Sequence, residues 1–347
     1  MPERKFSFEK RILRKLSDRP MNALVSRKML RESRLDVTRI NKIVERVRAG
    51  DPLDETEQTV LFSIISPALR PAIPVVNNRP EQTDHPLWLA LNEAAAQGVL
   101  EAVCKATGRI EYSSGAEFKS YGSGFLVADD LIMTNRHVAD IFSMPVRGIG
   151  NFLKFGYSAR INFCREKDRW DSDPSSTRNV IEIVMLHPWF DLALLRIDDV
   201  PDGVQPLSLS VVDADAALDT RIAVVGYPSK NPDENVDIQR EIISEFDSKH
   251  ISPGFIDAVE TKTFEGKTGR VLGHDSSTLT GNSGSPVVDL VSGNVVGLHF
   301  RGNTDGLNWA VPSSEVASDV RVVDAGVTFE GDAVAQPGPW ETAWAVS

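Results

Sequence analysis

Three segments of the sequence carry side chains that together suit the hydrolysis of an amide bond. They are YGSGFLVADDLIMTNRHVAD, which contains His137, HPWFDLALLRID, which contains Asp191, and TLTGNSGSPVVD, which contains Ser283. An alcohol attacks an amide only when a neighbouring base takes its proton, and that base needs a carboxylate to hold it in the correct tautomer. Each of the three side chains lies at the end of a predicted strand. Their types and order therefore predict nucleophilic catalysis by a serine.

The motifs TNRHV, DLALL and GNSGSP, in this order, resemble the signatures of the chymotrypsin-like, or trypsin-like, serine proteases. The spacings of 54 positions from His137 to Asp191 and 92 positions from Asp191 to Ser283 fit this family as well. The resemblance covers residues from about 106 to 323. It implies a mainly β fold of two six-stranded antiparallel barrels with the catalytic residues in the cleft between them. It also implies a serine endopeptidase that acts on protein or peptide substrates.

The resemblance gives each of these residues a role. Ser283 is the expected nucleophile, His137 takes its proton and later delivers it to the leaving amine, and Asp191 orients the imidazole and stabilises the imidazolium. The backbone amides of Gly281 and Ser283 are expected to bind the oxyanion. Glycine suits position 281 because it permits a φ that turns its N–H toward the cavity. Gly122 is expected to allow tight packing of an early strand.

Two departures from secreted relatives concern activation. Family members that are activated by limited proteolysis carry an aspartate immediately before the nucleophile, and this chain has Asn282 there, whose neutral amide cannot form the required ion pair. No cysteine lies next to His137, so the disulfide common in secreted members is missing. These features resemble bacterial, intracellular-compatible members. Regulation is expected from the basic N-terminal region or from a protein partner bound to it, rather than from zymogen cleavage.

The substrate pocket of the family is built from residues just before the nucleophile and from the strand that follows it. The candidates here are Ser277, Thr278, His299 and Gly302. No aspartate occupies the position six residues before Ser283, where trypsin carries the charge that selects Lys or Arg. Thr278 and His299 resemble the hydroxyl and imidazole with which glutamyl endopeptidases hold an acidic side chain. A preference for Glu before the scissile bond is therefore a hypothesis. The alternative is that His299 is a strand histidine beneath a pocket for a small or neutral side chain.

The elements that must position these residues divide the chain into several parts. Helical spacing of apolar residues, together with capping signals, predicts a small basic helical domain over residues 1–66. Prolines at positions 67, 71, 74, 80 and 86 predict an extended linker over residues 67–86. The protease domain is expected over residues 87–323, with an Ala- and Leu-rich helical lead-in before many short strands separated by turn residues. Residues 324–347 lose the strand pattern and are expected to form a tail.

Composition and charge limit the function classes. The chain has 347 residues, 41% of them hydrophobic and 25% charged, which is typical of a folded globular protein. Its net charge is −11, although residues 1–50 alone carry fifteen Lys and Arg against six Asp and Glu. An acidic chain of this kind is a poor candidate for general nucleic-acid binding. No apolar run suits a membrane span and no secretory signal is recognised, so a cytoplasmic protein is expected. Neither a cofactor nor a metal is predicted.

The remaining histidines and cysteines are given structural interpretations. His187 is an alternative candidate for the base, but it precedes Asp191 by four residues and is therefore expected on the same strand or turn rather than across a cleft. His85, His250 and His274 lie in polar stretches and are expected at the surface, whereas Cys104 and Cys164 are expected in the core. Two alternative functions stay open at this point. One is a non-catalytic binding module on a protease scaffold, and the other is a latent protease that a partner of the N-terminal domain activates.

Overall fold

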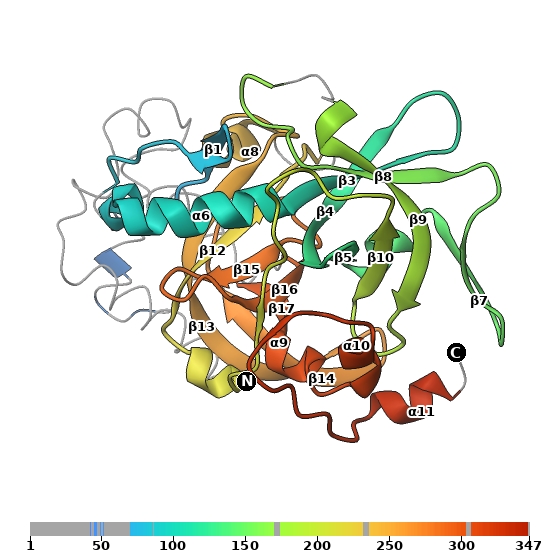
Figure 1. Cartoon of the computed structure of the whole chain (residues 1–347). Helices are drawn as coiled ribbons and strands as arrows, with labels where there is room; N and C mark the ends of the chain where they lie inside the picture. The colour runs from blue at the N-terminus through green and yellow to red at the C-terminus, as the bar shows by residue number, and fades with distance from the viewer. Residues whose placement is uncertain are drawn as a thin grey trace. The chain divides into compact units, whose positions relative to one another are not determined.

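The computed structural model describes residues 70–345, apart from 86, 170–173, 232–235 and 303–306, together with residues 42, 45, 46, 49 and 51. The chain divides into two units, Met1–Pro71 and Ala72–Ser347, and the elements below belong to the second unit (Figure 1). The helical domain predicted over residues 1–66 lies outside the described residues, apart from those five isolated positions. It therefore stays a prediction.

Six strands of the second unit close into a barrel in the order β10-β5-β4-β3-β8-β9. Short continuous apolar runs form its most buried strands, as the four buried residues LIMT of β5 show. The six strands are β3 (Thr107–Ser113), β4 (Lys119–Ala128), β5 (Leu131–Thr134), β8 (Ser158–Asn162), β9 (Thr177–Leu186) and β10 (Ala193–Ile197). This closed barrel confirms one of the two barrels that the sequence predicts.

The second group of strands forms a ten-stranded sheet whose main path is β12-β15-β16-β17-β14-β13-β1-β2. Strand β12 also pairs with β13, so six of these strands pair in a circuit. The bounds are β1 (Ile73–Val76), β2 (Arg79–Pro80), β11 (Leu209–Ser210), β12 (Arg221–Gly226), β13 (His250–Phe264), β14 (Lys267–His274), β15 (Pro286–Asp289), β16 (Val295–Arg301), β17 (Asn308–Pro312) and β18 (Phe329–Glu330). The protein is mainly β, as predicted.

Strands β13 and β14 form a long hairpin that turns at Glu265 and Gly266. These two residues have φ values of 49° and 78°. Two consecutive positive φ values are what a type I′ turn requires, and this turn type matches the right-handed twist of the strands. Phe264 and Lys267 therefore lie directly opposite each other at the end of the hairpin.

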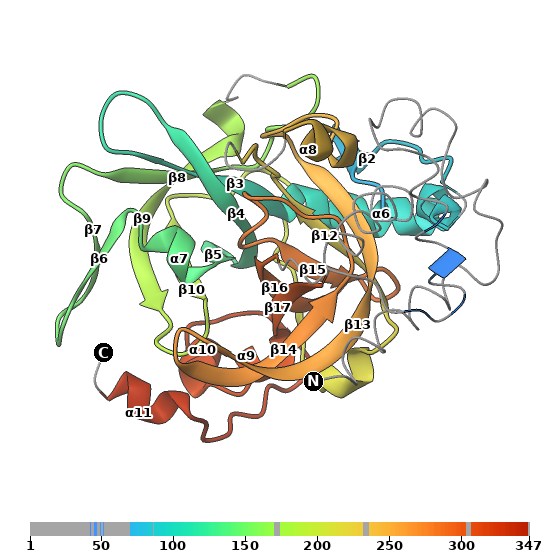
Figure 2. The ribbon, with the colours of Figure 1, turned by 180° about the vertical axis from the view of Figure 1, so that it is seen from behind.

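Short helices and a small sheet complete the unit, and Figure 2 shows α7 at the end of β5. The helices are α6 (Ala94–Ala106), α7 (Arg136–Ala139), α8 (Val236–Ile242), α9 (Ser313–Val316), α10 (Val320–Asp324) and α11 (Trp340–Trp344). The 3-10 helices are η1 (Leu89–Asn92), η2 (Pro174–Ser176) and η3 (Ala214–Ala217), and the separate sheet consists of β6 (Ser143–Val146) and β7 (Gly150–Leu153). The expected helical lead-in corresponds to α6.

Two segments differ from the elements expected for them. Residues 73–80, predicted as linker, form β1 and β2, because Val75 is fully buried and its N–H donates to the carbonyl of Lys249 at 3.1 Å. A proline is tolerated in such a strand near the sheet edge. The segment predicted as a tail contains β18 and α11, and Trp340 of α11 is buried. Burial of this large aromatic side chain stabilises the docked position of the segment.

Candidate active site

His137 and Asp191 are in direct contact. Oδ2 of Asp191 lies 2.6 Å from Nδ1 of His137, and Oδ1 accepts a hydrogen bond from the backbone N–H of His137 at 2.9 Å. His137 lies in α7, and Asp191 lies in the loop between β9 and β10. A carboxylate on Nδ1 holds the proton there and leaves Nε2 free to accept another, which is the arrangement that a general base requires.

The barrel brings these two residues together through neighbouring strands. Strand β5 ends just before α7, and Thr134 at its end pairs with Ala193 at the start of β10. Asn135 is fully buried, and its Nδ2 donates to the backbone carbonyl of Asp191 at 2.8 Å. The carboxylate is therefore held both by the strand pairing and by a buried side chain.

The loop that carries Ser283 is fastened to β4 by Ser123. The backbone N–H of Ser123 donates to the carbonyl of Ser283 at 2.8 Å, and its Oγ donates to the carbonyl of Gly281 at 2.8 Å. The same Oγ accepts from the N–H of Tyr227 at 3.0 Å. Thr134 Oγ1 donates to the carbonyl of Ser123 at 2.7 Å. One buried serine thus connects the Ser283 loop to the end of the strand that leads to His137, a role that the sequence analysis missed.

Gly122 lies where the Ser283 loop approaches α7. A Cβ atom at this position would lie 2.8 Å from the side chain of Val138 and 3.0 Å from the carbonyl oxygen of Ser283. Close-packed interiors leave no room for such an atom without displacement of its neighbours. Val138 directly follows His137, so the tight packing expected at Gly122 is confirmed. It is what allows the segment of the serine to lie beside the helix of the histidine.

The backbone of the Ser283 loop leaves two amides unpaired. The other amides of the loop, those of Asn282, Gly284 and Ser285, donate to backbone carbonyls at 2.9–3.1 Å. Among the described residues, no acceptor takes the N–H of Gly281 or of Ser283. Gly281 has a φ of 90°, and a Cβ there would meet the carbonyl of Tyr227. The conformation that glycine was expected to permit at position 281 is therefore present.

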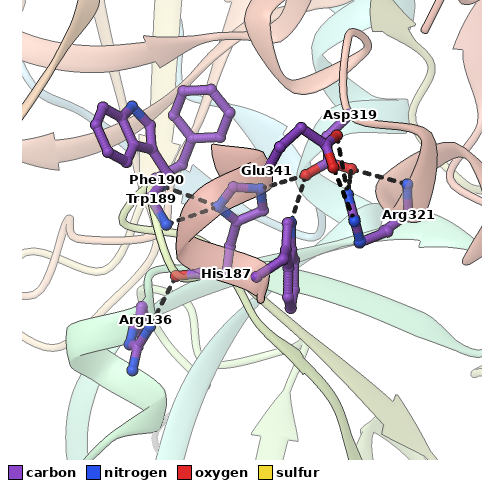
Figure 3. Close-up of polar contacts among 8 residues, drawn as sticks. Arg136, His187, Trp189, Phe190, Asp319, Arg321 and Glu341 are labelled. Atoms are coloured by element: carbon purple, nitrogen blue, oxygen red, sulfur yellow. Dashed lines mark hydrogen bonds and ion pairs between the residues drawn. The ribbon is translucent and has the colours of Figure 1, made fainter. Parts of the chain in front are cut away.

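His187 organises the loop that carries Asp191 (Figure 3). Its Nδ1 accepts hydrogen bonds from the backbone N–H groups of Trp189 at 3.1 Å and Phe190 at 2.9 Å. Because Nδ1 accepts twice, the proton of the ring lies on Nε2, which is 3.0 Å from Oδ2 of Asp319. Burial lowers the pKa of His187, which favours the neutral ring. The imidazole thus pairs with Asp319 and not with Ser283.

Asp319 connects this loop to the C-terminal helix. Its carboxylate is fully buried and also accepts hydrogen bonds from Trp344 Nε1 at 2.7 Å and from the backbone N–H of Arg321 at 2.9 Å. Burial alone would raise the pKa of Asp319, but the hydrogen bonds from His187 and Trp344 outweigh it and bring the pKa to about 2. Arg321 pairs with Glu341 of α11 at 3.0 Å. The C-terminal segment thus contacts the loop of Asp191 through the buried carboxylate of Asp319, a contact that the sequence analysis did not predict.

The predicted pocket residues lie on two segments that Asn308 connects. Nδ2 of Asn308 donates to the carbonyl of Ser276 at 2.6 Å, and its Oδ1 lies 3.1 Å from the position of a Cβ on Gly302. The carbonyl of His299 accepts from the N–H of Gly284 at 2.9 Å, which places β16 against the Ser283 loop. Ser277 is buried, Thr278 half-buried and Gly302 exposed.

The interpretation of His250 and His274 as surface residues is wrong. Both are buried, at the start of β13 and the end of β14, because each strand end pairs with a neighbouring strand on both of its sides. Nε2 of His274 lies 3.1 Å from Nδ1 of His299. Burial lowers the pKa of His274 to about 4 and that of His299 well below its usual range, so both rings are neutral near pH 7.

Within the residues that the structure describes, Cys104 and the possible metal ligands do not form a second site. Cys104 is buried as expected, and burial raises its thiol pKa to about 12, so it is not a nucleophile near pH 7. Within the described part of the chain, no group of three or more His, Cys, Asp or Glu residues is placed to hold a metal ion. No described helix has the length and apolar character needed to cross a membrane.

The family described as the trypsin-like peptidase domain matches residues 122–298, a range that contains His137, Asp191 and Ser283. The chain belongs to the trypsin-like peptidases. It is therefore a serine protease of the trypsin type, and the expected resemblance is confirmed.

The named relatives of this chain are proteases as well. A probable serine protease of Lysobacter enzymogenes is 26% identical over 301 residues, which cover 78% of this chain and 77% of that protein. A glutamyl endopeptidase of Staphylococcus aureus is 26% identical over 54% of this trypsin-like peptidase and 45% of its own length. Protease Do-like 4, mitochondrial, of Arabidopsis thaliana is 24% identical over 61% of this chain and 34% of its own length. The match thus spans less than half of the last two proteins.

Among solved structures, the active form of the Rv3671c protease from M. tuberculosis is 21% identical, with a TM-score of 0.47. The superposition covers 76% of this peptidase and 95% of that chain.

Proposed function

We propose that this trypsin-like peptidase cleaves protein substrates through Ser283, His137 and Asp191, by way of an acyl-enzyme. The observation that supports this most directly is the 2.6 Å contact between His137 Nδ1 and Asp191 Oδ2. This contact keeps a proton on Nδ1 of His137, so that Nε2 can act as the base. The serine loop lies beside the same helix because Gly122 leaves room for it.

The proposed reaction assigns one step to each group. Oγ of Ser283 attacks the scissile carbonyl carbon while Nε2 of His137 takes its proton, and Asp191 stabilises the resulting imidazolium. The amides of Gly281 and Ser283 donate to the oxyanion. Collapse of the tetrahedral intermediate breaks the C–N bond as His137 protonates the leaving amine. Water then attacks the acyl-enzyme in the same manner and regenerates Ser283.

We also propose a preference for glutamate before the scissile bond. Nδ1 of His274 is buried and has no hydrogen-bond partner. The tautomer without a proton on Nδ1 therefore costs the least free energy, because a buried N–H without an acceptor is avoided. Nε2 of His274 then donates to Nδ1 of His299, and the proton of His299 lies on Nε2. This nitrogen has no hydrogen-bond partner within the described chain and is available to donate to a carboxylate, together with the hydroxyl of Thr278.

Labelling with a fluorophosphonate probe tests the catalytic proposal. The wild-type chain should be labelled at Ser283, and Ser283→Ala and His137→Ala should not be labelled. Ser285→Ala is the matched control, because its buried Oγ has no partner and it lies in the same loop. No labelling of well-folded wild-type protein would contradict the proposal and favour a non-catalytic binding module.

A peptide panel tests the glutamate preference. The peptides differ only in the residue before the scissile bond, which is Glu, Gln, Ala, Leu or Arg. We expect the highest kcat/KM for Glu, and a selective loss of that preference in His299→Asn. Equal or faster cleavage after Ala, Leu or Arg would exclude the preference and leave the catalytic proposal intact.

A further inference from the structure

A cleft of about 570 Å³ adjoins the candidate catalytic pair. His137 and Asp191 form part of one wall, together with Trp189 and Phe190 from the loop of Asp191. The end of the β13–β14 hairpin forms another wall, and Phe300 and Arg301 of β16 form a third. Phe300 and Arg301 directly follow His299, so the cleft adjoins the strand that carries the proposed specificity pocket.

The charge of the cleft is opposite to that of the surrounding chain. Beyond residue 50 the sequence has 23 Lys and Arg against 43 Asp and Glu. The lining of the cleft instead has five basic and three acidic residues, which are Arg136, Lys262, Lys267, Arg270, Arg301, Asp140, Asp191 and Glu265. A locally basic surface on an acidic protein selects anionic groups of a ligand.

Three of these five cations are already engaged. Arg270 pairs with Asp213 and Asp215 at 3.0 Å each. Lys262 pairs at 3.0 Å with Glu260, a residue that does not line the cleft. Arg136 donates to the carbonyl of His187 at 2.9 Å, and its nearest carboxylate, that of Asp140, is 3.7 Å away.

Lys267 and Arg301 have no ion-pair partner among the described residues. Lys267 is half-buried. Its pKa is lowered mainly by burial and further by the nearby charge of Arg136. The guanidinium of Arg301 lies 5.7 Å from the ring centre of Phe264, the residue opposite Lys267 across the type I′ turn. Of the acidic lining residues, Asp191 is held by His137, and Glu265 is exposed at the hairpin tip. The cleft therefore holds two cations that form no ion pair within the described part of the chain.

We infer that this cleft binds a carboxylate side chain of the substrate, two to four residues before the scissile bond, through Lys267 and Arg301. The inference rests on the proposed function, because that function sets the direction in which the substrate crosses the site. An extended peptide advances about 3.3 Å per residue, so these positions reach along the cleft beyond the pocket of His299. Phe264 and Phe300, 5.0 Å apart in an edge-to-face pair, support the methylene groups of the bound side chain.

Pairs of peptides that differ only by Glu or Gln at the second, third or fourth position before the scissile bond test this inference. We expect kcat/KM to be about two- to five-fold higher for Glu at one or more of these positions, the range of a partly exposed ion pair. Added salt should reduce the ratio. In Lys267→Met the ratio should decrease toward the part that Arg301 supplies, and in Lys267→Glu it should decrease further. Lys119→Met, an exposed lysine outside the cleft, should keep the wild-type ratio.

The design separates this inference from the proposed function. Each ratio compares two substrates on one variant, so any general effect of Lys267 on His137 cancels. Fluorophosphonate labelling of every variant reports whether the catalytic site is formed. Intact labelling with a Glu to Gln ratio of one at all three positions in the wild type would overturn the carboxylate subsite alone. A ratio that Lys267→Met leaves unchanged would overturn it as well.

Discussion

Nε2 of His187 lies 3.0 Å from Oδ2 of Asp319, a residue 132 positions further along the chain. The two side chains are fully buried. The opposite nitrogen of His187 accepts two backbone N–H groups of the loop that leads to Asp191. The position of the candidate catalytic carboxylate therefore depends on a residue near the C-terminus, although no contact joins Asp319 to Asp191 directly.

Removing the hydrogen bond between Trp344 and Asp319 should weaken this arrangement. In Trp344→Phe the ring is largely kept but the Nε1 donor is lost, so the free energy of unfolding should fall by about 2 kcal/mol, as for a hydrogen bond to a charged group. Chemical denaturation measures this change. Val334→Ala, an exposed change in the same tail, should be neutral, and equal stability of the Trp344→Phe protein and the wild type would contradict the role of Trp344.

Ser123→Ala should lower kcat more than it changes KM. The substitution removes the hydroxyl that holds the carbonyl of Gly281, and it leaves the N–H of Tyr227 buried without an acceptor, at a cost of about 1–3 kcal/mol in stability. Steady-state kinetics and thermal unfolding check both effects. Ser120→Ala on the same strand is the control, because its buried hydroxyl has no partner. Similar behaviour of the two variants would show that the Ser123 contacts are unimportant.

Gly122→Ala should reduce both stability and fluorophosphonate labelling. The added methyl group has to displace either the side chain of Val138 or the backbone of Ser283. A misfit of this kind in a packed interior costs about 1–3 kcal/mol. Gly115→Ala is the matched control, since nothing lies within 4 Å of the new atom there. Full labelling and wild-type stability of the Gly122→Ala protein would contradict the close approach.

Stability should fall as the pH drops from about 6.5 to about 4. The pKa values of His250 and His274 are each lowered by burial to about 4, whereas the unfolded chain takes up these protons near pH 6.5. Between these values the unfolded state binds more protons, so acid favours unfolding by up to about 1.4 kcal/mol per pH unit for each histidine. Denaturation curves at several pH values measure the slope.

His250→Gln isolates one of these contributions. The variant should show a shallower pH dependence, because one buried titratable ring is gone. Asp319 does not add to the slope in this range, since its pKa of about 2 is lowered and its contribution is lost only in stronger acid. An unchanged slope in His250→Gln would show that this ring does not titrate as its burial indicates.

The sequence predicted the residues of the candidate site better than the contacts that hold them. His137, Asp191 and Ser283 stand in short motifs whose chemistry is recognisable without a structure. Nothing in the sequence around Ser123 or Asp319 marks them as important polar residues. Their roles arise only from contacts between segments that are distant in sequence. His274 was misassigned for the same reason, because its burial comes from tertiary packing rather than from the polar residues that follow it.

The β1 segment illustrates the limits of local signals as well. Prolines predict a break in regular structure, yet Pro74 lies in a strand because Ile73 and Val75 bury their side chains on either side of it. The gain from burying two apolar residues outweighs the proline's poor strand propensity. Local propensity therefore failed at β1 because tertiary burial outweighs it there.

The Ser283 loop takes its shape from Ser123 on one side and from the carbonyl of His299 on the other. These partners are separated by more than half of the polypeptide. During translation, His299 leaves the ribosome long after Ser123, so the Ser283 loop can reach its final shape only after β16 has been synthesised.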